Sequence, residues 1–361
     1  MKLLHTADLH VGDSRNLPNY LERQRAMLYW LTEQAKQHEV DAVLIAGDIF
    51  DTKHVLPRER DMFMEWLLDH DRAAFKSEFV TIMIGGNHDE IEAGYTHLHG
   101  LKRLMQRNVL QRTVVVDVHA QCLPVQSLRD PDAERMWVAC MPAANYRGDE
   151  LSTAVRAFRS SLDLKAEKSG EPIHYFVVMA HEAIVGATNE MGNYRARGPR
   201  LDTKLDVTYW ALGDIHKPYQ AMAPNAWYPG SPIQHEFGDV STERGCLLVD
   251  LDDPTNPRRL QVEGVVPLIT LYDKPDEWPT DAIVRFEGTA EEIADTHFPD
   301  NVVAFKPLVE VENLSREAIA IDLAGYAILE GLDDVLLEQA VPPERWEAVG
   351  DMLRNALDAC R

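Results

Sequence analysis

An aspartate and a histidine two positions apart, Asp8 and His10, follow the first hydrophobic run of the chain. Residues 2–5 are apolar enough to form a short buried strand. In extended backbone, residues i and i+2 point to the same side, so both side chains can reach one point beyond the strand. A carboxylate oxygen beside an imidazole nitrogen suits Mn²⁺, Fe²⁺ or Zn²⁺ better than Ca²⁺. Taken alone, the pair has a simpler interpretation, a turn aspartate followed by a solvated histidine.

The same arrangement recurs where later hydrophobic runs stop. The polar residues at these ends are Asp48 after 44–46, Asn87, His88 and Asp89 after 81–84, His181 after 177–180, and Asp214 and His216 after 209–212. Ligands of α/β proteins gather at the carboxyl ends of the strands. Repetition at five strand ends makes chance a poor explanation, so the sequence predicts a metal centre built from these residues.

Alternating helical and strand patterns are expected to bring these ends together. Helices are predicted at 19–38, 57–74, 95–107 and 149–167, and strands at 42–46, 79–84, 113–118, 136–141, 174–180, 207–212, 226–229 and 245–250. The β-α-β-α-β start predicts parallel strands joined by right-handed crossovers. Residues 1–250 are therefore predicted to form a layered α/β sandwich.

The rest of the chain is predicted to form a smaller addition. The turn-rich segment 250–257 indicates a domain boundary, and mixed strand and helix patterns predict an α+β domain at 258–340. A last helix is predicted within 342–361, where Pro342 and Pro343 precede an apolar helical face. Two interpretations of that face stay open, packing on its own domain and docking of a partner.

Length and composition limit the class of protein. The chain has 361 residues, of which 45% are hydrophobic and 26% charged, which is typical of a globular protein of two or three domains. No apolar run is long enough for a membrane span, and a strand begins at once, so we expect a cytoplasmic protein without a signal peptide. Its four separated cysteines are expected to be reduced thiols. A net charge of −23 argues against general affinity for nucleic acids.

Together, these motifs resemble those of the calcineurin-like metallophosphoesterases. That pattern is Asp-x-His, Gly-Asp, Gly-Asn-His, a lone His and Gly-His-x-His, and it appears here around Asp8, Asp48, Asn87, His181 and His216. The opening His-Thr-Ala-Asp-Leu-His and the later Tyr-Pro-Gly-Ser-Pro at 228–232 are similar to the Mre11/SbcD exonuclease branch, in its bacterial and phage form. The resemblance implies a four-layer α/β metallophosphoesterase sandwich with a smaller α+β capping domain.

The resemblance also implies two divalent metal ions, Mn²⁺ first and Mg²⁺ as an alternative. The first ion would be held by Asp8, His10, Asp48 and His216, and the second by Asp48, Asn87, His181 and Asp214. Asp48 would bridge the two ions, because two cations that lie ~3.5–4 Å apart need a carboxylate ligand in common. Asp214 departs from the pattern, because most of the family has a histidine there. Asp51 stands where archaeal and eukaryotic members often carry a histidine, so the bacterial type is closer to this sequence.

Two neighbours of the implied ligands are predicted to be catalytic. His88 is expected to face the phosphate without binding metal and to protonate the leaving 3′ oxygen, or else to donate a hydrogen bond to a ligand. Asp89 is expected to orient His88 or its loop. Glu182 has two interpretations, a brace for His181 and a surface residue. Tyr194, Arg195, Arg197 and Arg200 form the best local basic patch and are predicted to bind DNA, the alternative being a solvated loop.

The leading functional hypothesis is a Mn²⁺-dependent DNA exonuclease, also cutting single strands. By the resemblance it would work as a homodimer with an SMC-like coiled-coil ATPase, in DNA repair, recombination or replication. The alternative is a phosphodiesterase or phosphoprotein phosphatase on the same scaffold, which the acidic charge favours. A third interpretation, a scaffold without activity, fits poorly with a nearly complete ligand set.

Overall fold

The computed structural model describes residues 1–307 apart from 131, 133, 144–145, 147, 189–197 and 240–242. Residues 308–361, which include the predicted terminal helix at 342–361 and much of the predicted domain at 258–340, lie outside the described residues. The chain divides into two compact units, residues 1–287 with 296–306, and residues 288–295 with 307–361. Of the second unit, the helix α5 (Ala290–Ala294) is described, and Thr289 caps its first turn.

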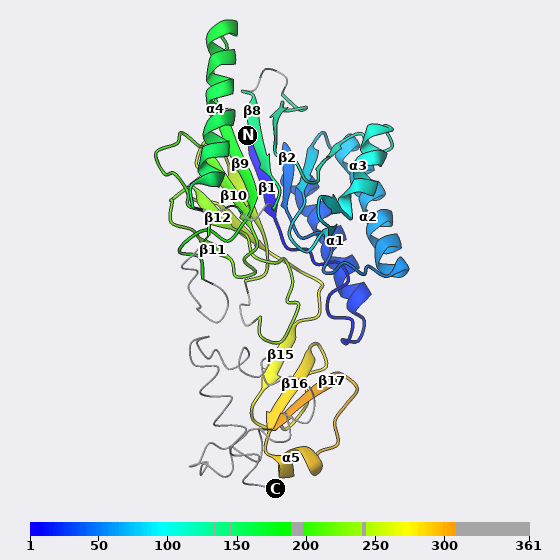
Figure 1. Ribbon diagram of the computed structural model, residues 1–361. Coiled ribbons are helices and arrows are strands. Elements are labelled where there is room, and N and C mark those ends of the chain that lie inside the picture. The colour runs from blue at the N-terminus through cyan, green and yellow to red at the C-terminus, as the bar shows by residue number, and fades with distance from the viewer. Residues whose placement is uncertain are drawn as a thin grey trace. The chain divides into compact units, whose positions relative to one another are not determined.

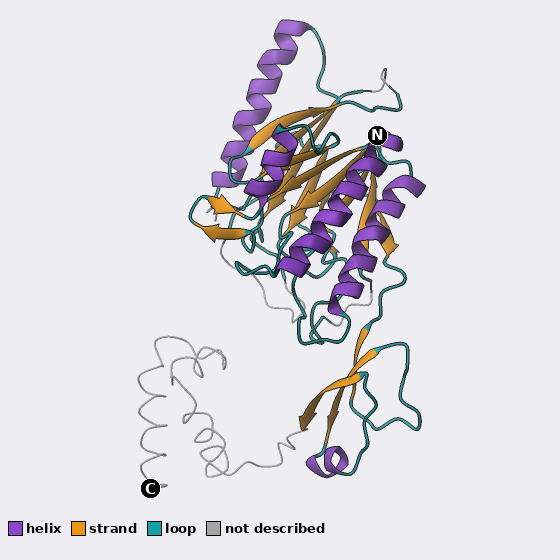
Figure 2. Cartoon of the chain, turned by 90° about the vertical axis from the view of Figure 1, so that its right-hand side faces the viewer, coloured by secondary structure: helices purple, strands orange, loops and turns teal. Residues whose placement is uncertain are grey.

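A six-stranded sheet in the order β14-β13-β1-β2-β3-β6 carries the first three polar motifs. Its strands are β1 (Lys2–Thr6), β2 (Ala42–Ala46), β3 (Val80–Ile84), β6 (Thr113–Val116), β13 (Gly245–Asp250) and β14 (Arg258–Gln261). The first four run parallel, while β13 and β14 are antiparallel to their neighbours. Three helices, α1 (Tyr20–Gln37), α2 (Pro57–Lys76) and α3 (Leu98–Gln106), cover one face of this sheet (Figure 2).

A second six-stranded sheet in the order β11-β12-β10-β9-β8-β7 carries the last two motifs. Its strands are β7 (Gln121–Val125), β8 (Met136–Met141), β9 (Tyr175–His181), β10 (Tyr209–Gly213), β11 (Tyr219–Gln220) and β12 (Ala226–Tyr228). β8, β9, β10 and β12 are parallel, with β7 and β11 antiparallel at the two edges. The long helix α4 (Glu150–Ser169) packs on its outer face (Figure 1).

Alternation along the strands builds three apolar interfaces between four layers. Leu4 and Val43 face the helices α1 and α2, whereas Leu3 and Leu44 face the second sheet. On the far side of that sheet, Trp210 packs with residues of α4. The strands are buried on both faces, as expected of parallel strands between two other layers. The predicted four-layer α/β sandwich is thus confirmed.

The sheet continues past the boundary predicted at 250–257. That segment is the turn between β13 and β14, whose residues pair from Gly245 with Gln261 to Leu248 with Arg258. Of the two strands that follow this turn, β14 belongs to the first sheet, and β15 (Leu268–Leu271) joins a different sheet. This three-stranded sheet also contains β16 (Ile283–Gly288) and β17 (Val302–Pro307). A short hairpin, β4 (Glu90–Glu92) with β5 (Tyr95–Thr96), precedes α3, which starts later than predicted.

Candidate metal centre

The loops after β1 and β2 are hydrogen-bonded to each other at the carboxyl edge of the first sheet. The Asp8 amide donates to the Gly47 carbonyl at 3.1 Å, and the His10 amide donates to the Asp48 carbonyl at 3.0 Å. From the second sheet, the Asp214 amide donates to Oδ1 of Asp8 at 3.1 Å. The two sheets therefore meet at this edge, and motifs about two hundred residues apart in sequence become neighbours.

The backbone at these motifs is held in an unfavourable conformation. Asp8, His10, Asp48 and Asp214 have φ angles of 54°, 42°, 49° and 89°, although none is a glycine. Positive φ is sparsely populated by such residues and persists only where surrounding structure imposes it. Strain of this kind gathers at functional sites, and here it falls on four of the predicted ligands.

Asp48 lies at the centre of the predicted ligands. Its Oδ2 is 3.5 Å from Nε2 of His10 on one side and 3.3 Å from Nε2 of His181 on the other. Its Oδ1 accepts a hydrogen bond of 2.9 Å from the backbone amide of His88. One buried carboxylate therefore contacts residues of both implied ligand sets.

The imidazole groups are arranged as ligands of a cation would be. Nε2 of His216 and Nε2 of His10 face each other at 3.0 Å. His181 points its Nδ1 at the Ala46 carbonyl at 2.7 Å, which assigns a proton to that nitrogen and directs Nε2 toward Oδ1 of Asn87 at 2.9 Å. Oδ2 of Asp8 is buried and has no hydrogen-bond partner among the described residues. Nitrogen and oxygen acceptors turned toward one another are what a bound cation would satisfy.

Three groups of described residues place ligand atoms within 4.8 Å of one another: Asp8, His10 and His216; Asp8, Asp48 and His181; His10, Asp51 and His88. The first group falls within the first implied ligand set. The second group joins Asp8 of that set to Asp48 and His181 of the second set, and Asp214 adds Oδ1 at 3.8 Å from Nε2 of His181. Mixed carboxylate and imidazole donors suit Mn²⁺, Fe²⁺ or Zn²⁺. The residues present therefore fit divalent metal ions.

The glycines of the motifs allow this close packing. A Cβ on Gly86 would lie 2.0 Å from Oδ1 of Asp48, and a Cβ on Gly47 would lie 2.2 Å from Nδ1 of His181. Gly47 also has a φ of 92°, which favours glycine. The Gly-Asp and Gly-Gly-Asn-His motifs thus need glycine because a side chain would displace a candidate ligand.

Charges in the centre shift the protonation of its members. Burial raises the pKa of Asp8 well above its ordinary value, and the carboxylates of Asp48 and Asp214 add to the rise. Burial would lower the pKa of His10, but hydrogen bonding to Asp51 and the negative charge of Asp48 outweigh it and raise the pKa to about 9. The negative charge of Asp48 likewise raises the pKa of His181 despite burial, whereas burial and the charge of His10 lower the pKa of His216 to about 4. In the metal-free protein, protons on His10 and His181 thus offset the carboxylates, which is the role that a cation would take over.

His88 and Asp89 are adjacent in sequence but occupy different surroundings. The side chain of His88 is 45% exposed, and its ring lies edge-on to that of His10 at 4.9 Å between centroids. The Asp89 carboxylate is buried and accepts hydrogen bonds from the amides of Ile49, Phe50 and Gly86 at 3.2, 2.9 and 2.9 Å. His88 is therefore open to a ligand, whereas Asp89 ties the loops after β2 and β3 together.

Two residues that sequence reasoning did not place in the centre lie at its border. Oδ1 of Asp51 is 3.2 Å from Nδ1 of His10, so this residue is a further candidate ligand. The sequence feature that could have identified Asp51 is its position three residues after Asp48 in the same motif. His235, which the sequence analysis did not single out, is buried with Nε2 3.2 Å from the Asp8 carbonyl, and its ring lies 5.0 Å from that of His10. No metal-ligand pattern marks His235, because it follows the last predicted ligand, His216, by 19 residues.

The remaining predicted site residues are less well placed. Tyr194, Arg195 and Arg197 lie outside the described residues. Arg200 is exposed, on a loop held to the start of α4 by its amide, which donates to the Gly148 carbonyl at 2.7 Å. Glu182 is buried, with Oε1 3.3 Å from the amide of Tyr146, so the surface interpretation of Glu182 was wrong.

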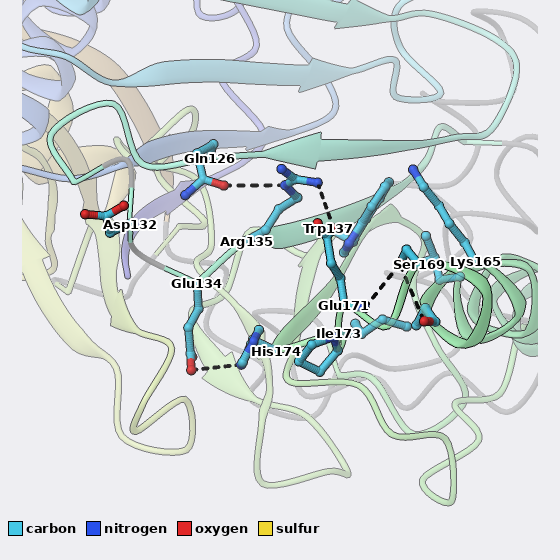
Figure 3. A pocket seen from close by; sticks show the side chains of 13 residues that line it. Gln126, Asp132, Glu134, Arg135, Trp137, Lys165, Ser169, Glu171, Ile173 and His174 are labelled. Carbon is cyan, nitrogen blue, oxygen red and sulfur yellow. Dashed lines mark hydrogen bonds and ion pairs between the residues drawn. The ribbon is translucent and has the colours of Figure 1, made fainter.

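A cavity of about 250 Å³ lies at the opposite end of the second sheet (Figure 3). Two ion pairs are formed by residues that line it, Glu134 with His174 at 2.8 Å and Arg135 with Glu171 at 3.9 Å. It borders the start of β9, whereas His181 stands at the end of that strand. The cavity is therefore separate from the candidate metal centre.

In the part of the chain that is described, no helix is both long and apolar enough to cross a membrane.

Comparison with known proteins places these observations in a family. The family model of the calcineurin-like phosphoesterases matches residues 1–218. The chain is 25% identical to the SbcD subunit of the nuclease SbcCD of Rhodobacter capsulatus, covering 95% of this chain and 91% of the relative. It is 26% identical to the protein of the same name from Staphylococcus epidermidis, over 76% of this chain and 71% of that one. Among solved structures, a dimetal phosphatase from Danio rerio aligns with a TM-score of 0.38 and 12% identity, covering 69% of this chain and 91% of that structure.

Proposed function

The chain belongs to the calcineurin-like phosphoesterase family, and on that premise we propose that it is a metal-dependent DNA exonuclease acting on phosphodiester bonds, with endonuclease activity on single strands. The relatives named as the SbcD subunit of the nuclease SbcCD, which the chain matches over most of its length, support the choice of a nuclease within the family. The centre described above supplies the residues for such a reaction.

The observation that carries this proposal is the position of Asp48. Its carboxylate lies between His10 and His181, which belong to the two separate ligand sets. A carboxylate shared in this way is the feature that holds two ions near one phosphate. We therefore assign Asp8, His10, Asp48 and His216 to one ion and Asp48, Asn87, His181 and Asp214 to the other, with Mn²⁺ preferred and Mg²⁺ as an alternative.

Two bound ions would bind the scissile phosphate, lower the pKa of the attacking water and stabilise charge in an in-line displacement. The chain's own residues set the geometry. The amide of His88 holds Oδ1 of Asp48, and the Ala46 carbonyl orients His181. These contacts fix the directions of the ligands before metal binds, which reduces the cost of assembling the site.

His88 is assigned the proton transfer to the leaving 3′ oxygen. It is the exposed imidazole of the centre, and Oδ1 of Asp51 lies 4.0 Å from its Nδ1. A positioned imidazole can protonate an alkoxide leaving group near neutral pH. Asp89 then serves catalysis indirectly, because its carboxylate holds the loop that carries Asn87 and His88.

DNA binding needs local positive charge on an otherwise acidic protein. We assign it to Tyr194, Arg195, Arg197 and Arg200, which fall between two metal motifs in the sequence. Arginines would contact phosphates, and the tyrosine ring would stack on a base. The bound metal ions add positive charge where the phosphate must lie.

Partners complete the proposal. The relatives are named as one subunit of a nuclease, which supports a partner subunit for this chain. We propose that the chain acts as a homodimer with an SMC-like coiled-coil ATPase in the cytoplasm. Residues 258–340, apart from the strand β14 that pairs in the first sheet, would shape entry of DNA as a capping domain. Residues 342–361 would dock the ATPase. Because the net charge of −23 opposes binding to DNA phosphates, a partner that binds DNA would supply the affinity that this chain lacks.

The test is a nuclease assay on linear duplex DNA with added Mn²⁺. We expect Mn²⁺-stimulated release of nucleotides that falls on the order of 10³-fold or more in Asp48→Asn, because one shared ligand serves both ions. Asp163→Asn is the matched control, since that carboxylate pairs with Arg159 on the surface of α4. Full metal-stimulated activity in Asp48→Asn would disprove the proposal. Parallel turnover of cyclic nucleotides and a phosphoprotein distinguishes the alternative, a phosphodiesterase or phosphatase, which the acidic charge favours.

A further inference from the structure

Gln234 pairs with the backbone of Leu268 as a neighbouring strand would. Its Oε1 accepts a hydrogen bond from the Leu268 amide, and its Nε2 donates to the Leu268 carbonyl, both at 2.9 Å. Leu268 opens β15, an edge strand of the sheet β15-β16-β17. A two-way exchange of hydrogen bonds with one residue is the unit of an antiparallel ladder. The side chain of Gln234 therefore fixes the start of this sheet.

The next residue lies against the metal centre. His235 is buried, with Nε2 3.2 Å from the carbonyl of Asp8 and Nδ1 3.3 Å from Oδ2 of Asp13. Its ring centroid is 5.0 Å from that of His10 and 5.5 Å from that of His216. A shift of His235 would therefore move the backbone or the rings of three candidate ligands.

Buried charged side chains hold His235 in place beside the candidate ligands. The amide of His235 donates to Oδ2 of Asp239 at 2.8 Å, and Oδ1 of Asp239 is 3.4 Å from Nη2 of Arg244. Arg244 in turn donates from Nη1 to the carbonyl of His216 at 2.6 Å. Because Asp239 and Arg244 are both buried, water cannot readily replace these bonds.

Apolar packing and the guanidinium of Arg23 connect the segment Gln234–Asp239 to the sheet β15-β16-β17. Leu17, Leu268 and Ile283 form a buried cluster against which Phe237 and Val303 pack. The guanidinium of Arg23 donates to the carbonyls of Val266 and Gln234 at 2.9 and 3.1 Å. The segment Gln234–Asp239 thus contacts the sheet on one side and the ligand loops on the other.

We propose that Gln234 is a positioning residue that couples the sheet β15-β16-β17 to the imidazole side of the metal centre. The inference builds on the proposed function, since it gives the sheet a way to tune metal binding by the nuclease. Displacing β15 moves Gln234, and the adjacent His235 transmits that movement to Asp8, His10 and His216. By linkage, metal binding must equally restrain the sheet.

The test measures metal binding and backbone exchange, with nuclease activity as a separate readout. We expect Gln234→Ala to bind Mn²⁺ about 10-fold more weakly by calorimetry, the lower end of the effect of residues that support ligands. In the unsubstituted protein, Mn²⁺ should slow hydrogen–deuterium exchange in residues 264–271, and Gln234→Ala should lose that response. Gln234→Glu, which still accepts from Leu268 but cannot donate, should lie between the two, and it serves as the test variant if Gln234→Ala does not fold.

Asn301→Ala is the matched control. The Asn301 amide donates to the carbonyls of Pro279 and Ala282 at 2.6 and 2.8 Å, so it braces the same region of the chain by similar bonds, neither of which involves the segment Gln234–Asp239. We expect its Mn²⁺ affinity to stay within about twofold of the unsubstituted protein. Equal weakening in both variants, or unchanged affinity and exchange response in the Gln234 variants, would overturn the coupling. Absence of nuclease activity would instead count against the proposed function, because calorimetry and exchange do not depend on it.

Discussion

Two buried polar clusters of the first sheet differ in how completely they are hydrogen-bonded. In the metal centre, Oδ2 of Asp8 has no hydrogen-bond partner among the described residues, and the Nε2 atoms of His10 and His216 face each other. The other cluster lies between α1, α2 and the sheet and is built around His70 and Asp71. Both contain histidine and aspartate, and both are buried.

The His70–Asp71 cluster is satisfied by the fold itself. His70 contacts Thr32 through Nδ1 at 2.7 Å and Thr81 through Nε2 at 2.8 Å. The Asp71 carboxylate accepts three hydrogen bonds, from the amides of Gln111 and Arg112 and the hydroxyl of Thr113, at 2.8–2.9 Å.

The completeness of hydrogen bonding separates structural from functional polar residues in this protein. A buried polar group costs free energy unless it is paired, so a fold supplies partners wherever the group serves structure alone. Where acceptors are left facing one another on strained backbone, a ligand supplies the missing partner. Changes in the two clusters should therefore affect different measurements.

The largest effect after loss of Asp48 is expected at His88. His88→Gln should lower the rate of DNA hydrolysis at saturating Mn²⁺ by ~10²-fold or more, because the proton donor is lost. Mn²⁺ affinity should stay unchanged in calorimetry, since His88 is assigned no metal. His174→Gln, at the cavity on the opposite end of the second sheet, is the control and should leave both quantities as they are. A large loss of Mn²⁺ affinity in His88→Gln would instead assign this residue as a ligand, together with Asp51.

Substitution of Asp71 should reduce stability and spare the metal centre. Asp71→Ala leaves three donors without their acceptor, so the free energy of unfolding in urea should fall by about 3 kcal/mol. Mn²⁺ should still raise the unfolding midpoint of this variant, whereas Asp48→Asn should lose most of that rise, because stabilisation by a ligand follows its affinity. If Mn²⁺ stabilised both variants equally, the contrast between the two clusters would be refuted.

The smallest effect concerns pH. Burial lowers the pKa of His70 to about 4, below the value of about 6.5 expected in the unfolded chain. As the pH falls, the unfolded state therefore binds the proton before the folded state does. The contribution of His70 to the free energy of unfolding is fully present above pH 6.5 and declines as the pH falls toward 4. Urea unfolding of His70→Gln should show a decline smaller by about 2 kcal/mol than the unsubstituted protein between these values. His54→Gln, at an exposed position, should keep the full decline, and an identical pH profile for all three proteins would contradict the assignment.

Much of the fold was predictable because the strands have a strong local signal. The strands at 42–46, 136–141 and 245–250 occur at the predicted bounds, since continuous apolar runs of that length suit strands buried on both faces. The short strands β4, β5 and β11 were not predicted, because two or three residues show no periodicity. The boundary at 250–257 could not be told from a hairpin turn, since turn residues occur in both.

The family and the set of motif residues could be read from the amino-acid sequence, because a polar residue after an apolar run is a local pattern that requires no knowledge of contacts. The way those residues meet follows from the folded structure. It brought Asp51 to His10, buried His235 beside His10, and showed that Asp89 accepts hydrogen bonds from the loops after β2 and β3. The physical reason is distance along the chain: Asp8 contacts Asp214 across 206 residues, and such a pairing depends on how the two sheets pack, which no local pattern encodes.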